Sequence, residues 1–232
     1  MPGRAAYEPG RRLRTASIGK LLLLIEVARG IEAGELDPYE LLGKDPDLAV
    51  ADSGLWQHLG TDVLPVADVA VLVASVSDNL ATNVLIHRVG LDRVAALGAS
   101  LGLTATALHD VVRDVRSADH PARLSSGSAA ELSLLLHRLP GVEGGDRVLD
   151  WMRTSADLSM VASAFDLDPL SHAGVTLRNK TGTDDGVRCD VGVAGGVSYA
   201  VLANWAPASA TVGEVLATMR AVGDAIRVLV GK

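Results

Sequence analysis

Apolar residues are spaced differently in the first three quarters of the chain and in the last quarter. An apolar run begins near Ser17 and continues to about Gly30, which predicts a first helix. Helical spacing returns at Val66, breaks near the letters SVSDN, and resumes through LATNVLIHRVG and LDRVAALGASLG. This middle part therefore predicts several alanine-rich helices, preceded by an irregular stretch from 41 to 64.

Three further helices are predicted after this middle part. Ser128 and Glu131 have the spacing of a capping box in front of an apolar run, which is typical of a helix start. Another helix is expected from about Arg147 to Met152. The last stretch, TVGEVLATMRAVGDAIRVLV, has one apolar face and predicts a closing helix.

Short strands are predicted between His172 and the closing helix. The stretches GVTLRNKTGT, RCDVGVAGG and SYAVLANWA are rich in valine and separated by turn residues, which favours consecutive antiparallel strands. Residues 1–14 predict a loop or a short edge strand. The whole order predicts one α+β domain, with a sheet lobe at about 1–35 and 170–232 and a helical lobe at about 36–169.

Composition and charge narrow the range of partners. The 21 basic and 28 acidic residues give a net charge of −7, and no cluster of Lys and Arg would attract nucleic acid. The six histidines lack the spacing of metal ligands, and no phosphate-binding glycine loop occurs, so neither a metal nor a cofactor is expected. Cys189 is the single cysteine, and we expect it to pack in the core.

The apolar run of the first helix is not expected to cross a membrane or to direct export. The stretch from Leu21 to Ile25 is far shorter than the roughly 20 residues that span a bilayer. Lys20 and Glu26 interrupt the run, and no small-residue cleavage site follows it. The chain as written is therefore expected to be cytoplasmic, and to be exported if its true start lies upstream.

The first chemical signal is the stretch RTASIGK, in which Ser17 and Lys20 stand three positions apart. On a helix these two side chains share a face. A lysine can take the proton of a serine only if burial or nearby cations lower its pKa from about 10.4. On its own, the pair also fits a capping serine beside a solvated lysine.

Two tripeptides favour the chemical interpretation. SDN, from Ser77 to Asn79, falls at a break between helical stretches and offers a hydroxyl for proton relay and a carboxamide for a substrate amide. KTG, from Lys180 to Gly182, offers a cation for an anionic group and a strand edge for a peptide-like backbone. Each tripeptide has a chance expectation on the order of a few per cent, so coincidence does not explain all three motifs in this order.

With these motifs the chain resembles the penicillin-recognising active-site-serine enzymes, and most closely the class A β-lactamase-like group. The resemblance extends from YEPGRRLRTASIGK to NKTGTDDGVRCD and so covers nearly the whole chain. It implies a β-lactamase/transpeptidase-like fold, in which an antiparallel sheet flanked by helices lies beside an all-helical lobe.

The resemblance implies catalytic roles for four residues. Ser17 would be the acylated nucleophile, and Lys20 the general base or proton shuttle. Ser77 would deliver the proton to the leaving nitrogen. Lys180 would hold the substrate carboxylate in place during these steps.

It also implies a set of substrate-binding groups along the KTG strand. Thr181 would help Lys180 to hold the carboxylate, and the strand continues through Gly182. The backbone N–H groups of Thr183 and of the nucleophile would form the oxyanion hole. Arg188 falls where the family often places an arginine for the carboxylate, and Asn79 would contact both the substrate and Lys20.

The sequence departs from the class A pattern in one loop. These enzymes carry a glutamate between the SDN motif and the next helix, where it positions the water that hydrolyses the acyl-enzyme. The corresponding stretch here, HDVVRDVRSADHPARL, has no glutamate. Asp110, Asp114 and Asp119 are the carboxylates that could substitute, but a shorter side chain on a different loop predicts slow deacylation.

A second departure lies at the start of the chain. The family usually has a signal peptide, a helix and a strand or two before the serine helix, whereas sixteen residues precede Ser17 here. The expected function is that of an active-site-serine hydrolase, in which a β-lactam or a related amide or ester acylates Ser17 and the acyl-enzyme is then hydrolysed. The substrate is expected to be small or peptide-like with a carboxylate, and the protein to be a monomer. The alternatives are a D-amino acid peptidase or esterase, and a β-lactam or cell-wall-fragment binding module without catalytic power.

Overall fold

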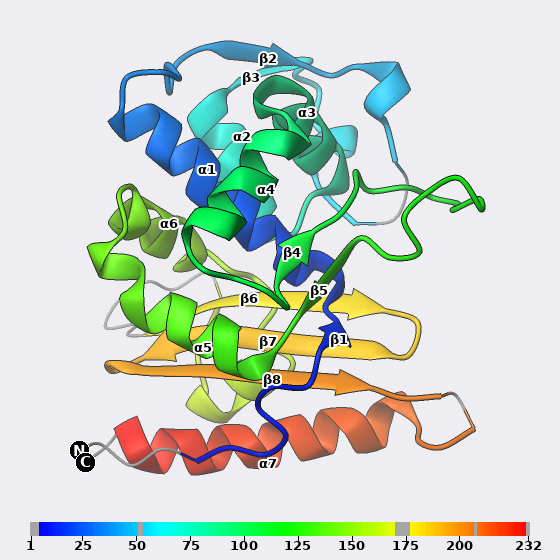
Figure 1. Cartoon of the computed structure of the whole chain (residues 1–232), viewed down its shortest axis with the longest axis vertical. Helices are drawn as coiled ribbons and strands as arrows, with labels where there is room; N and C mark the ends of the chain where they lie inside the picture. Colours follow the sequence, from blue (N-terminus) through cyan, green and yellow to red (C-terminus); the bar gives the residue numbers. More distant parts are fainter. Residues whose placement is uncertain (1–4, 51–52, 170–176, 207, 231–232) are drawn as a thin grey trace.

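The structure is a computed structural model that describes residues 5–50, 53–169, 177–206 and 208–230 (Figure 1). The helices are α1 (Lys20–Glu32), α2 (Val66–Ser75), α3 (Asn79–Val89), α4 (Leu91–Ser100), α5 (Ala129–Arg138), α6 (Gly145–Met152) and α7 (Val212–Val230). The strands are β1 (Leu13–Arg14), β2 (Leu41–Gly43), β3 (Val63–Pro65), β4 (Ala107–Leu108), β5 (Ser125–Gly127), β6 (Leu177–Asp184), β7 (Val187–Ala194) and β8 (Val197–Asn204).

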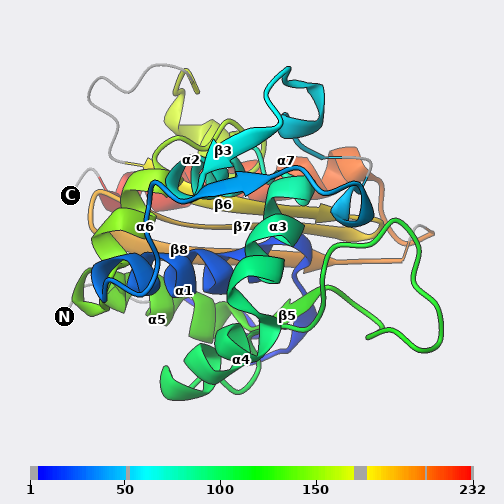
Figure 2. The same ribbon diagram turned by 90° about the horizontal axis from the view of Figure 1, so that it is seen from above.

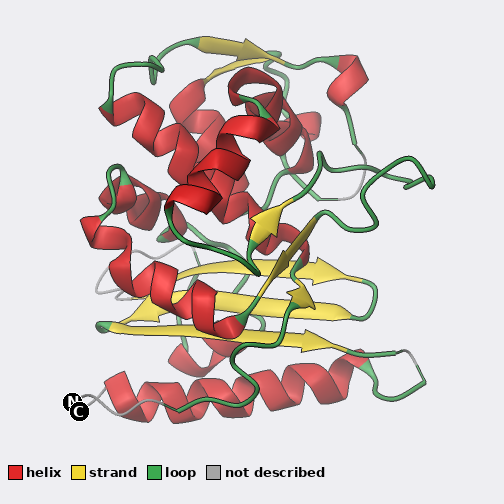
Figure 3. Ribbon diagram, viewed as in Figure 1, coloured by secondary structure: helices red, strands yellow, loops and turns green. Residues whose placement is uncertain are grey.

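The three long strands form an antiparallel meander in the order β6-β7-β8, as the sequence predicts (Figure 3). Residues 174–176 of the first predicted strand lie outside the described residues. Side chains alternate between the two faces of a strand. On β7, Cys189 and Val191 pack into the core shared with the helical part, whereas Ala194 packs with α7 on the other face. The expected core position of Cys189 is confirmed.

Helix α1 is the centre of the helical part of the molecule. Its residues from Lys20 to Ala28 are all buried, because α2, α3, α4 and α6 pack around it (Figure 2). In the part of the chain that the structure describes, no helix is both long and apolar enough to pass through a bilayer. Helix α1 therefore serves as a core helix that carries Lys20 into the middle of the molecule.

The start of the first helix differs from the prediction. Ser17 lies in a short 3₁₀ helix, η1 (Ala16–Gly19), and the α-helix begins only at Lys20. The expected edge strand, β1, pairs with β5 in a separate small sheet of order β1-β5-β4. The stretch 41–64, predicted to be irregular, contains β2 and most of its antiparallel partner β3.

The predicted capping box at α5 forms only in part. The Ser128 hydroxyl accepts a hydrogen bond from the Glu131 N–H, as expected of a cap. The Glu131 carboxylate, however, binds the backbone N–H groups of Thr104, Ala105 and Thr106 in a preceding loop. Burial opposes its charge, but these hydrogen bonds outweigh burial and lower the pKa of Glu131 to about 2.

Asp78, the middle residue of SDN, organises the turn between α2 and α3. Its buried carboxylate caps α3 by accepting the Ala81 N–H at 2.9 Å. It also accepts the N–H groups of Leu55 and Trp56 at 2.7 and 2.8 Å, and so ties a distant loop to the same turn. Its neighbours Ser77 and Asn79 are both candidate site residues, so this carboxylate fixes the backbone that positions their side chains.

We expect Asp78→Ala to destabilise the fold by about 3 kcal/mol, because three backbone donors lose a charged acceptor inside the protein. Urea unfolding followed by circular dichroism would measure the change. Asp150→Ala, at an exposed position of α6, is the matched control and should cost less than about 0.5 kcal/mol. Equal losses in the two variants would contradict the organising role of Asp78.

Candidate active site

Ser17 is the second residue of η1, directly after a strained residue. Ala16 has φ of +48°, in the left-handed region that a residue with a Cβ rarely adopts. The turn packs against β6 at Gly182, where an added Cβ would collide with the Thr15 carbonyl. Glycine therefore lets the KTG strand approach the backbone that carries Ser17.

Lys20, the first residue of α1, is fully buried beneath the cleft. Its ammonium donates to the Asn79 side-chain oxygen at 2.7 Å and to the Ser77 carbonyl at 2.7 Å. A longer contact of 3.3 Å reaches the Ser77 hydroxyl. These contacts position the Lys20 ammonium against the SDN turn.

Lys180 approaches the same hydroxyl from the sheet. It is almost fully buried on β6, and its ammonium donates to Ser77 Oγ at 3.0 Å and to the Thr181 carbonyl at 2.8 Å. Burial lowers the pKa of Lys180 to about 8, even though the charges of Asp157 and Asp190 oppose that change. Lys180 can therefore gain or lose its charge near neutral pH.

Ser77 Oγ is the atom at which the two lysines meet. A hydroxyl has two lone pairs and one hydrogen. Because Lys20 and Lys180 both donate to it, the hydrogen of Ser77 is left for a third partner. Ser77 also has a left-handed φ of +58°, so a strained backbone holds this hydroxyl in place.

The free edge of the sheet provides backbone donors and acceptors. Strand β6 is an edge strand, and its last pair, Asp184 with Val187, closes the hairpin. Hydrogen-bonded and non-hydrogen-bonded pairs alternate in an antiparallel ladder, so Thr181 and Thr183 direct their N–H and C=O groups outwards. The bond from Lys180 to the Thr181 carbonyl agrees with this alternation.

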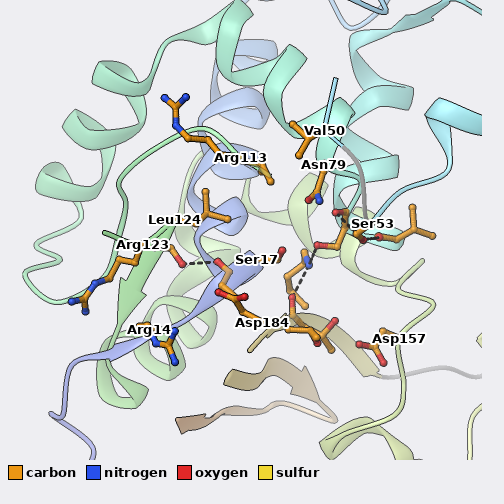
Figure 4. A pocket seen from close by; sticks show the side chains of 18 of the residues that line it. Arg14, Ser17, Val50, Ser53, Asn79, Arg113, Arg123, Leu124, Asp157 and Asp184 are labelled. Atoms are coloured by element: carbon orange, nitrogen blue, oxygen red, sulfur yellow. Dashed lines mark hydrogen bonds between the residues drawn. The ribbon is translucent and has the colours of Figure 1, made fainter. Parts of the chain in front are cut away.

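These groups line one cleft of about 870 Å³ (Figure 4). Of the residues that the sequence points to, the cleft is lined by Ser17, Ser77, Asn79, Lys180, Thr181 and Thr183. Lys20 lies beneath it, and Gly182 packs against η1. The three motifs therefore meet at one place, although they are far apart in the sequence.

Arg188, which the resemblance suggests for the substrate carboxylate, is not among the described residues that line the cleft. Its guanidinium donates to the carbonyls of Asp184 and Val187 and lies 5.9 Å from the centre of the Trp205 ring. Arg14, which the sequence reading did not single out, lines the cleft beside Asp184 (Figure 4). Its position on β1, next to the serine turn, is the signal that could have identified it.

The loop between β4 and β5 forms another wall of the cleft. Asp110 is buried and bound by Arg113 and Arg116. Burial alone would raise its pKa, but hydrogen bonds from these arginines outweigh burial and lower the pKa of Asp110. Of the three loop aspartates, Asp114 lines the cleft, and Asp119 is exposed.

The chain matches the model of the Beta-lactamase enzyme family over residues 2–227. It belongs to this family. No curated protein matches the sequence significantly. The family and the fold together make the chain a serine hydrolase of the β-lactamase type that resembles class A enzymes.

Solved β-lactamases and a penicillin-binding protein have the same fold. A β-lactamase from Sphaerobacter thermophilus is 25% identical, with a TM-score of 0.83, covering 96% of this chain and 86% of that one. PBP-A is 22% identical, with a TM-score of 0.74, covering 94% and 81%. An ancestral class A β-lactamase is 20% identical, with a TM-score of 0.76, covering 97% and 88%. The predicted β-lactamase/transpeptidase-like α+β fold is confirmed.

We expect the acylation rate constant kcat/KM for an anionic penicillin to fall as the pH rises through about 8. Below this pH Lys180 carries the charge that attracts a carboxylate, and above it the lysine is neutral. The rate of acyl-enzyme formation measured from pH 6 to 10 would show the alkaline limb. In Lys180→Arg, whose cation does not titrate in this range, the limb should vanish; an unchanged limb would assign it to another group.

Proposed function

We propose that this β-lactamase-family hydrolase is acylated at Ser17 by β-lactams or related amides and esters that carry a carboxylate, and that it releases the acyl group slowly. The observation that carries the proposal is the Ser77 hydroxyl, which both buried lysines contact in the cleft that contains Ser17. A binding module would not need two buried cations around a serine hydroxyl, and burying each cation is costly.

The proposed acylation returns Lys20 and Ser77 to their starting protonation states. Ser17 Oγ attacks the carbonyl carbon, and Lys20 Nζ accepts its proton. The N–H groups of Ser17 and Thr183 stabilise the oxyanion. When the C–N bond breaks, Ser77 gives its proton to the leaving nitrogen, and Lys20 restores the proton to Ser77.

The carboxylate of the substrate would bind at the β6 end of the cleft. Lys180 supplies a charge there, and Thr181 lines the same wall. Arg14 adds a second cation beside Asp184 (Figure 4). We therefore assign carboxylate recognition to Lys180 with Arg14, while Arg188 supports the hairpin through its two backbone carbonyls.

Slow deacylation is supported by the construction of the loop between β4 and β5. Val112 lines the cleft, and its backbone is held by Asn83, which accepts from the Val112 N–H at 2.8 Å and donates to its carbonyl at 3.0 Å. An apolar side chain thus occupies a rigid position where the loop faces the site. The buried Asp110 is engaged by two arginines, so it is unsuited to activate water.

A peptidase or esterase acting on D-amino acid peptides is the second candidate. The open edge of β6 favours it, because an extended peptide can pair with such an edge through backbone hydrogen bonds. Among the solved neighbours, a variant of PBP-A is an acyl-enzyme complex with penicillin G. Both candidates use the same acylation step and differ in the lifetime of the acyl-enzyme.

Intact-protein mass spectrometry after mixing with benzylpenicillin should show one covalent adduct that persists for minutes or longer. Hydrolysis of a chromogenic cephalosporin, followed in parallel, should be slow. Ser17→Ala should form no adduct, because the nucleophilic oxygen is gone. An adduct that also forms in Ser17→Ala, or the absence of any adduct and turnover in the native chain, would contradict the proposed function.

Val112→Glu should shorten the life of the acyl-enzyme by about 10-fold or more, because it adds a general base on a rigid part of the loop that faces the site. The decay of the adduct after removal of excess penicillin would measure this effect. Val112→Gln has the same size without a base and should leave the decay unchanged. Rapid turnover by the native chain would contradict slow deacylation and direct attention to Asp114.

A further inference from the structure

The peptide bond between Ala16 and Ser17 holds one of the proposed oxyanion donors. A trans peptide is planar, so its C=O and N–H groups point in opposite directions. The direction of the Ala16 carbonyl therefore determines where the Ser17 N–H points. Because Ala16 has φ of +48°, the surrounding structure has to impose this orientation against the preference of the chain.

Ser125 binds the carbonyl of this peptide. Its buried hydroxyl donates to the Ala16 oxygen at 2.6 Å. Thr15 Oγ1 lies 2.7 Å from Ser125 Oγ. Ser125 has one hydroxyl hydrogen, and a carbonyl has none to give, so the Thr15 hydroxyl donates to Ser125 and Ser125 donates to Ala16.

Ser125 is itself rigidly placed. It lies in β5, between β1 and β4 in the small sheet, and its carbonyl accepts the Thr15 N–H at 3.4 Å. A Cβ on Gly19 would collide with the Ser125 side chain, so glycine allows this close approach. The hydroxyl pair therefore joins two fixed segments on either side of the strained residue.

The opposite end of the peptide faces the site. Among the described residues, no protein group accepts a hydrogen bond from the Ser17 N–H. The Thr183 N–H also points away from its sheet neighbour, as the alternation of the β6–β7 ladder requires. Ser17 and Thr183 both line the cleft, so two uncommitted backbone donors are available there.

We propose that Ser125, aided by Thr15, is a positioning residue that holds the Ala16–Ser17 peptide so that the Ser17 N–H serves the oxyanion hole. The inference rests on the proposed function, since it assumes acylation at Ser17. The hydroxyl pair acts through the backbone and does not touch the reacting atoms. Its loss should therefore weaken transition-state binding more than ground-state binding.

Ser125→Ala should lower the rate constant for acylation by benzylpenicillin by about 10- to 100-fold. This decrease is no larger than the one caused by removing a whole oxyanion donor. The affinity of a boronic acid that forms a tetrahedral adduct with Ser17 should fall by a similar factor. The dissociation constant of the non-covalent penicillin complex should stay within about 3-fold of the native value.

Ser126→Ala is the matched control on the same strand. Its hydroxyl donates to the Ala105 carbonyl and contacts Arg12 and His109, away from the Ala16 peptide. It should acylate at nearly the native rate. Thr15→Val removes the hydroxyl at similar volume and should slow acylation. Thr15→Ser retains the hydroxyl and should be acylated at nearly the native rate. This pair of variants tests the inference even if Ser125→Ala does not fold.

The outcomes distinguish a failure of the proposed function from a failure of the Ser125 inference. Native protein that is not acylated overturns the proposed function, and the inference with it. If the native protein is acylated, then native acylation or native boronate affinity in Ser125→Ala overturns the inference alone. Equal losses in Thr15→Val and Thr15→Ser also overturn it, because they would mean that the hydroxyl is irrelevant.

Discussion

The shared contact of two buried lysines with Ser77 Oγ is the constraint on which the rest of the site depends. Lys20 comes from the central helix and Lys180 from the sheet, so one hydroxyl joins the two parts of the fold. Taking an ammonium out of water costs several kcal/mol unless hydrogen bonds replace its hydration. Each lysine is therefore surrounded by oxygen acceptors, and each acceptor has to be held by its own element.

Backbone strain occurs at two serine-bearing turns of the site, and in each case buried polar groups stabilise it. Ala16, before Ser17, and Ser77 itself both have left-handed φ values. The hydroxyl of Ser125 holds the first turn and the carboxylate of Asp78 holds the second. Strain of this kind costs about 1–3 kcal/mol per residue, so the supporting hydrogen bonds are needed to keep both hydroxyls in the cleft.

The motifs could be found from sequence because their chemistry lies in residue identity and order. The three long strands and the closing helix also follow from local periodicity. Ser125 could not be found in this way, since its partner Ala16 is 109 positions away and a lone serine has no local signature. The surroundings of Arg188 could not be predicted from its sequence position either: its guanidinium binds the carbonyls of Asp184 and Val187 and lies near Trp205.

The acylation and deacylation groups depend on different parts of the structure. The proposed acylation groups lie on η1, α1, the SDN turn and β6. The wall that faces the proposed acyl group is a loop in which Asp110 is used to hold Arg113 and Arg116. A carboxylate held by two cations stabilises the loop but is a poor base, because its proton affinity is reduced. The loop can therefore change the fate of the acyl-enzyme while the acylation groups keep their geometry, which makes acyl-enzyme lifetime the property that separates a lactamase from a peptidase on this fold.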